Sequence, residues 1–155
     1  ALKSMAQSGR QQNIELVIIG ASMPATPPDL GMNVHYIGHL HDEVSQVMLY
    51  SAADVLVAPS TQENLSNTVM EALACGTPVV AFAIGGMTDL ITHQRNGYLA
   101  FPFETDDLAT GISWVLEDQS RHNALSLFAR QTAVERYSVE TIAKRYQALY
   151  EDILR

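Results

Sequence analysis

The stretch PSTQENLSNTVMEALACGTPVVAFAIGG, from Pro59 to Gly86, decides the fold of this chain. It reads as a polar turn, a helix and a buried strand, and it follows the apolar run Val55–Val57, which is typical of another strand. A strand, a polar turn and a helix amino terminus together make a site that suits a phosphate-bearing ligand. Two carboxylates, Glu63 and Glu71, flank the expected start of this helix.

Outward from this stretch, strand and helix patterns alternate, which predicts an α/β fold with a doubly wound parallel sheet covered on both faces. Short runs rich in Val and Ile read as buried strands: Leu16–Ile19, Val34–Ile37, Val55–Val57 and Val79–Phe82. After Pro102 the pattern becomes helical, over Thr105–Leu116, Ser120–Arg136 and Val139–Leu154. We therefore expect one domain, residues 1–155, that ends in helices.

Two further segments have clear local signatures. Glu43–Ala53 carries apolar residues at three- and four-residue spacing, which predicts a helix with one apolar face, and Asp42 is placed to cap it. The stripe consists of Val44, Val47, Met48 and Ala52. Ala21–Asn33 contains Pro24, Pro27, Pro28 and Gly31 and reads as a loop. In the last helix, Ile142, Tyr146, Leu149 and Ile153 again share one face.

Composition excludes several classes of partner. The 155 residues carry a formal charge of −8, and this acidity argues against sequence-independent binding to nucleic acid or to anionic membranes. The apolar run Val79–Ile84 is far shorter than the roughly 20 residues that span a bilayer, so we expect no transmembrane segment. The amino terminus has no apolar block like that of a signal peptide. One cysteine cannot form an internal disulfide and fits a reducing compartment, so we expect a cytoplasmic protein.

The order of motifs resembles one family, the retaining, nucleotide-sugar-dependent glycosyltransferases of group 1 with the GT-B fold. Their signature is Glu, seven residues, then Glu-Ala, which is met here by Glu63 and Glu71-Ala72. The likeness runs from Asn13 to about Tyr146. It includes IELVIIG (Ile14–Gly20), VHYIG (Val34–Gly38), DVLVAPS (Asp54–Ser60), CGTPVVAF (Cys75–Phe82), Gly85-Gly86 and NGYL (Asn96–Leu99). Family members more often have Phe-Gly where this chain has Leu65-Ser66, and Glu where it has Asp89.

The resemblance implies a Rossmann-like carboxyl-terminal half that binds a nucleoside-diphosphate sugar. Glu63, the residue assigned to catalysis, would accept hydrogen bonds from the donor sugar, and Glu71 would accept them from the two ribose hydroxyls. The other implied contacts fall into three groups. Amides at a helix start between Asn64 and Thr68 would face the diphosphate and the sugar, from Asn64, Leu65, Ser66, Asn67 and Thr68; the nucleobase would lie against Tyr36, Ile37 and Gly38, with His39 nearby; and Gly20, Gly85 and Gly86 stand at strand ends. No cofactor and no metal are expected, because family members neutralise the leaving diphosphate with a helix dipole and basic side chains.

Each implied role has an ordinary structural alternative. Ser60 to Glu63 and Thr68 to Glu71 both have capping-box spacing, in which the Glu only bonds back to the helix start. The pair Gly85-Gly86 can admit a ligand to the backbone or can simply form a turn. His39 and His41 have a spacing open to metal ligands, but a solvated loop is the alternative that we favour.

The family begins this domain with a strand ending in Gly-Arg and a Lys-Gly turn, whereas this chain opens in what reads as the following helix, Ala1–Gly9. We therefore expect a fragment that lacks the first strand and the amino-terminal acceptor domain. Because that strand lies mid-sheet, the two edges left behind should either close on each other or recruit a strand from another copy.

The reaction implied is transfer of a sugar to a hydroxyl acceptor with retained anomeric configuration, by a hexosyltransferase-type enzyme. A role in polysaccharide or glycoconjugate synthesis would fit this reaction. The isolated fragment should have little or no transferase activity and weak nucleotide binding. The alternatives are half of a GT-B sugar-nucleotide epimerase and a non-catalytic α/β regulatory domain.

Overall fold

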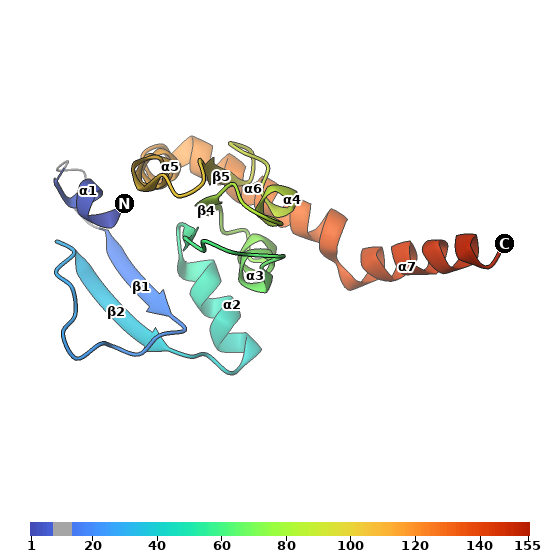
Figure 1. Ribbon diagram of the computed structural model, residues 1–155, viewed down its shortest axis with the longest axis horizontal. Coiled ribbons are helices and arrows are strands. Elements are labelled where there is room, and N and C mark those ends of the chain that lie inside the picture. The colour runs from blue at the N-terminus through green and yellow to red at the C-terminus, as the bar shows by residue number, and fades with distance from the viewer. Residues whose placement is uncertain (8–13) are drawn as a thin grey trace.

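The computed structural model describes residues 1–7 and 14–155 (Figure 1). The chain opens with helix α1, Leu2–Gln7, as the sequence predicts. Ser8, Gly9 and Asn13, which belong to the expected first helix and to the start of the family resemblance, lie outside the described residues.

The described strands form two parallel sheets. The first pairs β1 (Glu15–Ile19) with β2 (Asn33–Gly38). The second has the order β3-β4-β5, from Leu56–Ala58, Val79–Phe82 and Gly97–Ala100. The predicted parallel α/β class with carboxyl-terminal helices is confirmed. Strand β5 overlaps the NGYL segment and extends to Ala100. It was not predicted as a strand, because it begins at a glycine and has only a short apolar run.

The two sheets do not pair with each other in the described parts of the chain. In Figure 1, β1 is the strand of its sheet that lies nearer the rest of the molecule. Ile14, just before β1, and Ile19, within it, pack against the main core, so side chains rather than backbone hydrogen bonds join the two parts. The expectation that the edges of β1 and β3 close directly on each other is therefore wrong, and recruitment of a strand stays a prediction.

The core lies on both faces of the three-stranded sheet, and β4 alternates between them. Val79 and Ala81 pack on one face with helices α3 (Asn67–Ala74), α4 (Met87–Leu90) and α6 (Gln119–Tyr137). Val80 and Phe82 pack on the other face with α5 (Thr105–Leu116) and Met5 of α1. Coverage of both faces explains why every residue of β4 is buried and apolar.

Helix α2, Glu43–Ala52, forms where the sequence predicts it, and its cap is confirmed because Asp42 Oδ1 accepts a hydrogen bond from Ser45 N at 2.8 Å. Its apolar stripe, however, is not a buried face. Val44 and Met48 are 69% and 67% exposed, whereas Tyr50 is only 5% exposed. The helix is therefore anchored by an aromatic residue outside the predicted stripe, because that side faces α3.

Helix α7, Val139–Ile153, starts at the cap residue Ser138 directly after α6. Figure 1 shows it extending away from the body of the molecule, and none of its residues is buried. Its predicted apolar face is thus present but uncovered by the described residues. No helix in the described parts of the chain is long and apolar enough to cross a membrane.

Candidate functional site

The candidate site is built around the amino terminus of α3, where the chain leaves β3 through the loop that starts at Pro59. Ser66 is the N-cap, and its Oγ accepts a hydrogen bond from Val69 N at 3.4 Å. The helix therefore begins at Asn67, within the predicted interval. The amide groups of its first turn lack intrahelical partners and carry the positive end of the helix dipole, which favours an anion.

The identity of the cap decides between the two interpretations of the carboxylates. A capping box built on Ser66 would place its Glu or Gln at position 69, which is a valine. Glu63 lies in the loop before the helix, and its Oε1 accepts a hydrogen bond from Asn64 N at 3.0 Å. Glu71 lies in the second turn of α3, and its Oε2 accepts one from the Tyr50 hydroxyl at 3.1 Å. The capping-box alternative is therefore wrong for both residues.

The Gly85-Gly86 turn lies directly against the loop that carries Glu63. Gly86 N donates a hydrogen bond to the Asn64 carbonyl at 2.7 Å. A Cβ atom on Gly85 would lie 1.9 Å from Glu63 O, and one on Gly86 would lie 1.9 Å from Asn64 O. This contact explains why the turn has no side chains, and a direct ligand contact at either glycine stays a prediction. The two segments meet at the carboxyl ends of β3 and β4.

A second group of predicted residues gathers at the carboxyl ends of β1 and β2. Gly20 N donates to the Gly38 carbonyl at 2.7 Å, which places Gly20 beside the end of the Tyr36–Gly38 segment. His39 follows this end, and its ring lies 6.3 Å from that of His41. No group of three or more His, Cys, Asp or Glu residues that could hold a metal ion occurs within residues 1–7 and 14–155.

The two groups are connected through α2. Gln46 donates from Nε2 to the Leu40 carbonyl at 3.2 Å, next to His39, and Tyr50 bonds to Glu71. Helix α2 thus spans from the loop after β2 to the second turn of α3. The hydrogen bonds of this connection do not join the Tyr36–His39 segment directly to the amino end of α3. That the two groups bind one ligand together therefore stays a prediction.

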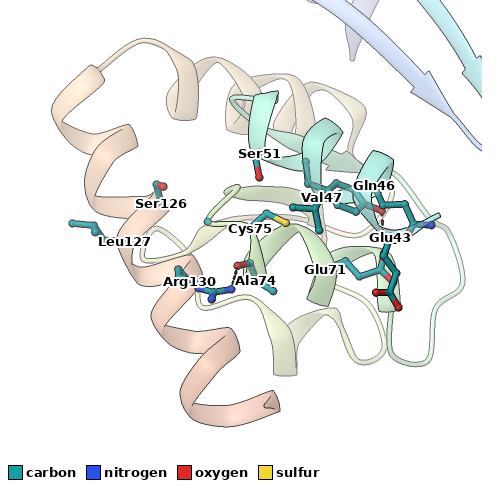
Figure 2. Close-up of a pocket in the computed structure, with 12 residues that line it drawn as sticks. Glu43, Gln46, Val47, Ser51, Glu71, Ala74, Cys75, Ser126, Leu127 and Arg130 are labelled. Atoms are coloured by element: carbon teal, nitrogen blue, oxygen red, sulfur yellow. Dashed lines mark hydrogen bonds between the residues drawn. The ribbon is translucent and has the colours of Figure 1, made fainter. Parts of the chain in front are cut away.

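A cavity of about 740 Å³ lies between α2, α3 and α6, and Glu71 is the predicted site residue that lines it (Figure 2). Figure 2 shows Glu43 and Glu71 toward one end of the cavity and Ser126 and Arg130 toward the other. Arg130 donates to the Ala74 carbonyl at the carboxyl end of α3. The acidic end is therefore the end that adjoins the candidate site.

Tyr50 is a residue of the site that the sequence interpretation missed. Burial is the main reason that its pKa rises to about 12, and its hydrogen bond to Glu71 adds to the shift. The hydroxyl therefore stays a hydrogen-bond donor at neutral pH. The signal in the sequence was limited to one aromatic residue among the aliphatic apolar residues of α2, because its partner lies 21 residues further along the chain.

Comparison with known proteins gives a consistent result. The family model described as "Glycosyl transferases group 1" matches residues 1–132. An uncharacterized glycosyltransferase of Methanocaldococcus jannaschii is 31% identical over 97% of this chain, which spans 40% of that relative. The sucrose-phosphate synthase of Thermosynechococcus elongatus matches 99% of this chain with a TM-score of 0.80 and 27% identity, over 42% of its own chain.

The HepE protein of Anabaena, solved in complex with UDP, matches 79% of this chain with a TM-score of 0.71 and 31% identity, over 34% of its own chain. A further HepE structure contains UDP-glucose. This chain thus spans well under half the length of these three proteins.

Proposed function

This chain belongs to the group 1 glycosyl transferases, and from that membership we propose that it binds the nucleoside-diphosphate sugar donor of such an enzyme. The observation that carries the proposal is the cap of α3. Because Ser66 closes the helix start, Glu63 and Glu71 are not used for capping and stand on either side of an anion-binding helix terminus. The UDP and UDP-glucose complexes of HepE support a ligand of this class.

In the proposed complex the first amides of α3 face the diphosphate, together with the polar side chains of Asn64, Asn67 and Thr68. Glu71 accepts hydrogen bonds from the ribose hydroxyls, and Glu63 accepts them from the sugar. During transfer the bond between the anomeric carbon and the diphosphate oxygen breaks, the acceptor oxygen bonds to that carbon, and the hydroxyl proton is released. The negative charge that develops on the diphosphate is stabilised by the preorganised amides.

The finer parts of the proposal concern the whole enzyme. We propose transfer of a hexosyl group with retention of anomeric configuration to a hydroxyl acceptor, in the cytoplasm, during synthesis of a polysaccharide or another glycoconjugate. The Tyr36–Gly38 segment and His39 are proposed to receive the nucleobase, since the carboxyl ends of parallel strands are where such folds bind ligands. The acceptor domain is proposed to be a separate part of the enzyme. Self-association through the unpaired edges of β1 and β3 is a further proposal.

Thermal unfolding tests the binding of the donor. We expect a nucleoside diphosphate, at a hundred times its Kd, to stabilise the chain by about 2.7 kcal/mol and so raise the melting temperature. Glu71→Ala should reduce the rise markedly, because the variant loses the ribose contact and keeps only the contacts to the rest of the nucleotide. Glu151→Ala serves as the control, since Glu151 lies on α7 and bonds only to Gln147 among the hydrogen bonds described for it.

Persistence of the full shift in Glu71→Ala would contradict the role of this carboxylate. Loss of the shift in both variants would indicate a general effect of removing acidic residues rather than a site at α3.

A further inference from the structure

The Tyr50 hydroxyl joins α2 to α3 at the carboxylate that we assign to the ribose. Tyr50 is the buried residue of a helix whose apolar stripe is otherwise exposed. Its hydroxyl donates to Glu71 Oε2 at 3.1 Å. Glu71 itself is exposed on the surface of α3 and lines the cavity in Figure 2. A buried donor is therefore bonded to an exposed acceptor.

We propose that Tyr50 is a positioning residue that orients the Glu71 carboxylate to receive the two ribose hydroxyls of a nucleoside diphosphate. This inference rests on the proposed function of the site and adds to it the residue that prepares the carboxylate before the ligand arrives.

Tyr50, the donor in this contact, is held by hydrogen bonds to its backbone and by core packing. The Tyr50 carbonyl accepts hydrogen bonds from Thr77 Oγ1 at 2.6 Å and from Ala53 N at 3.2 Å. Thr77 is itself buried and immediately precedes the segment that enters β4. The Tyr50 ring packs in the main core with α3 and α6. Its hydroxyl thus occupies one position relative to the sheet, because both the backbone and the ring are held.

The held carboxylate keeps enough capacity for its ligand. A carboxylate offers about four acceptor positions on its two oxygens, and Tyr50 uses one of them. The remaining positions suffice for a vicinal diol. A free glutamate on a helix surface would have to give up rotamer freedom on binding, and that loss is met in advance here by the bond to Tyr50. Removal of the hydroxyl should therefore weaken ribose recognition without removing the carboxylate.

The chain offers a matched control at Tyr98. Its hydroxyl donates to Asp107 Oδ1 at 2.8 Å, and burial is again the main reason that its pKa rises to about 12. This pair joins β5 to α5, away from α2 and α3. Tyr50→Phe and Tyr98→Phe thus each remove one hydroxyl from a tyrosine–carboxylate contact, and only the first affects Glu71.

The experiment is a calorimetric titration of the 155-residue chain with UDP and with 2′,3′-dideoxy-UDP. We expect the unaltered chain to bind UDP more tightly than the dideoxy compound. Tyr50→Phe should lower the affinity for UDP by about threefold to tenfold, the cost of ordering one or two side-chain torsions, and should lower the affinity for dideoxy-UDP by less. Tyr98→Phe should change neither affinity. In a Glu71→Ala background, Tyr50→Phe should have no further effect.

The possible results separate the two proposals. Equal losses for both nucleotides in Tyr50→Phe, no loss at all, or an undiminished effect in the Glu71→Ala background would overturn the positioning role. Ribose discrimination that disappears in Glu71→Ala but survives in Tyr50→Phe would overturn this inference and leave the proposed function intact. An unaltered chain that binds neither nucleotide, or both equally, would overturn the proposed function and this inference together.

Discussion

Gly86 has no side chain, and this allows two backbone segments of the candidate site to pack closely. Its backbone conformation, φ −72° and ψ 0°, is open to any residue, so space and not torsion restricts the position. A Cβ atom there would lie 1.9 Å from the Asn64 carbonyl oxygen, which belongs to the backbone of the facing loop. That loop carries Glu63, so the packing of Gly86 also sets the position of the proposed catalytic carboxylate.

Gly86→Ala is therefore expected to lower the free energy of unfolding by roughly 3 kcal/mol, because one of two backbone segments must move. Gly38→Ala is the control. Gly38 has a φ of 77° but nothing within 4 Å of an added Cβ, so it should cost only about 1 kcal/mol of backbone strain. Urea unfolding measures both. A loss in Gly86→Ala no larger than that in Gly38→Ala would contradict the steric account.

For single residues, the sequence predicted which positions belong to the candidate site better than it predicted the contacts that those residues make. The spacing between Glu63 and Glu71 matched the family signature, but the spacing of each from Ser60 or Thr68 also matched a capping box. Only the observed cap, Ser66, separates the two interpretations. Tyr50 could not be found from the sequence, since its meaning depends on a partner on another helix.

For the helices as well, the local sequence predicts where a helix forms but not which of its faces is buried. The existence of α2, α5, α6 and α7 follows from local periodicity and was predicted, with ends that agree to within one residue. The face that each helix buries depends on what lies opposite. The aliphatic stripe of α2 and the apolar face of α7 satisfy the helical pattern, but most of their residues are exposed in the described chain.

The caps of α2 and α3 should respond differently to pH. Ser66→Ala should cost about 1 kcal/mol at every pH, since a hydroxyl cap does not titrate in the accessible range. Asp42→Ala should destabilise only while the carboxylate is charged. Hydrogen bonding from Ser45 lowers the pKa of Asp42 below its ordinary value of 3.8. Its contribution is therefore complete above that value and disappears as the pH falls through the lower pKa of the folded state.

Unfolding of both variants by urea at neutral pH and below pH 3 checks this contrast. An Asp42→Ala effect that persists unchanged in acid would show that the residue stabilises α2 by something other than its charged cap.

The whole molecule is divided at the gap between its two sheets. In the described parts of the chain the β1-β2 pair and the β3-β4-β5 sheet share no backbone pairing. Ile14 and Ile19 pack against the core, and α2 links the loop after β2 to α3. The parallel class was predictable because buried strands alternate with helices. The separation was not, because it depends on which edges find a backbone partner after the chain has folded.

The unpaired edges lead to a prediction about assembly. We expect the 155-residue chain to self-associate with rising concentration, since an exposed edge offers a row of free backbone donors and acceptors. Sedimentation velocity over a hundredfold range of concentration measures this. A single monomeric species throughout that range would rule out recruitment of a strand from another copy.

We propose above all that the amino end of α3 and its two flanking carboxylates hold the diphosphate and ribose of a sugar donor. Backbone amide NMR during titration with UDP tests it most directly. We expect the largest shift changes on residues 64 to 68 and on Glu71, with saturation at one equivalent. Shift changes confined to residues of α6, or no shift changes at all, would contradict binding at the amino end of α3.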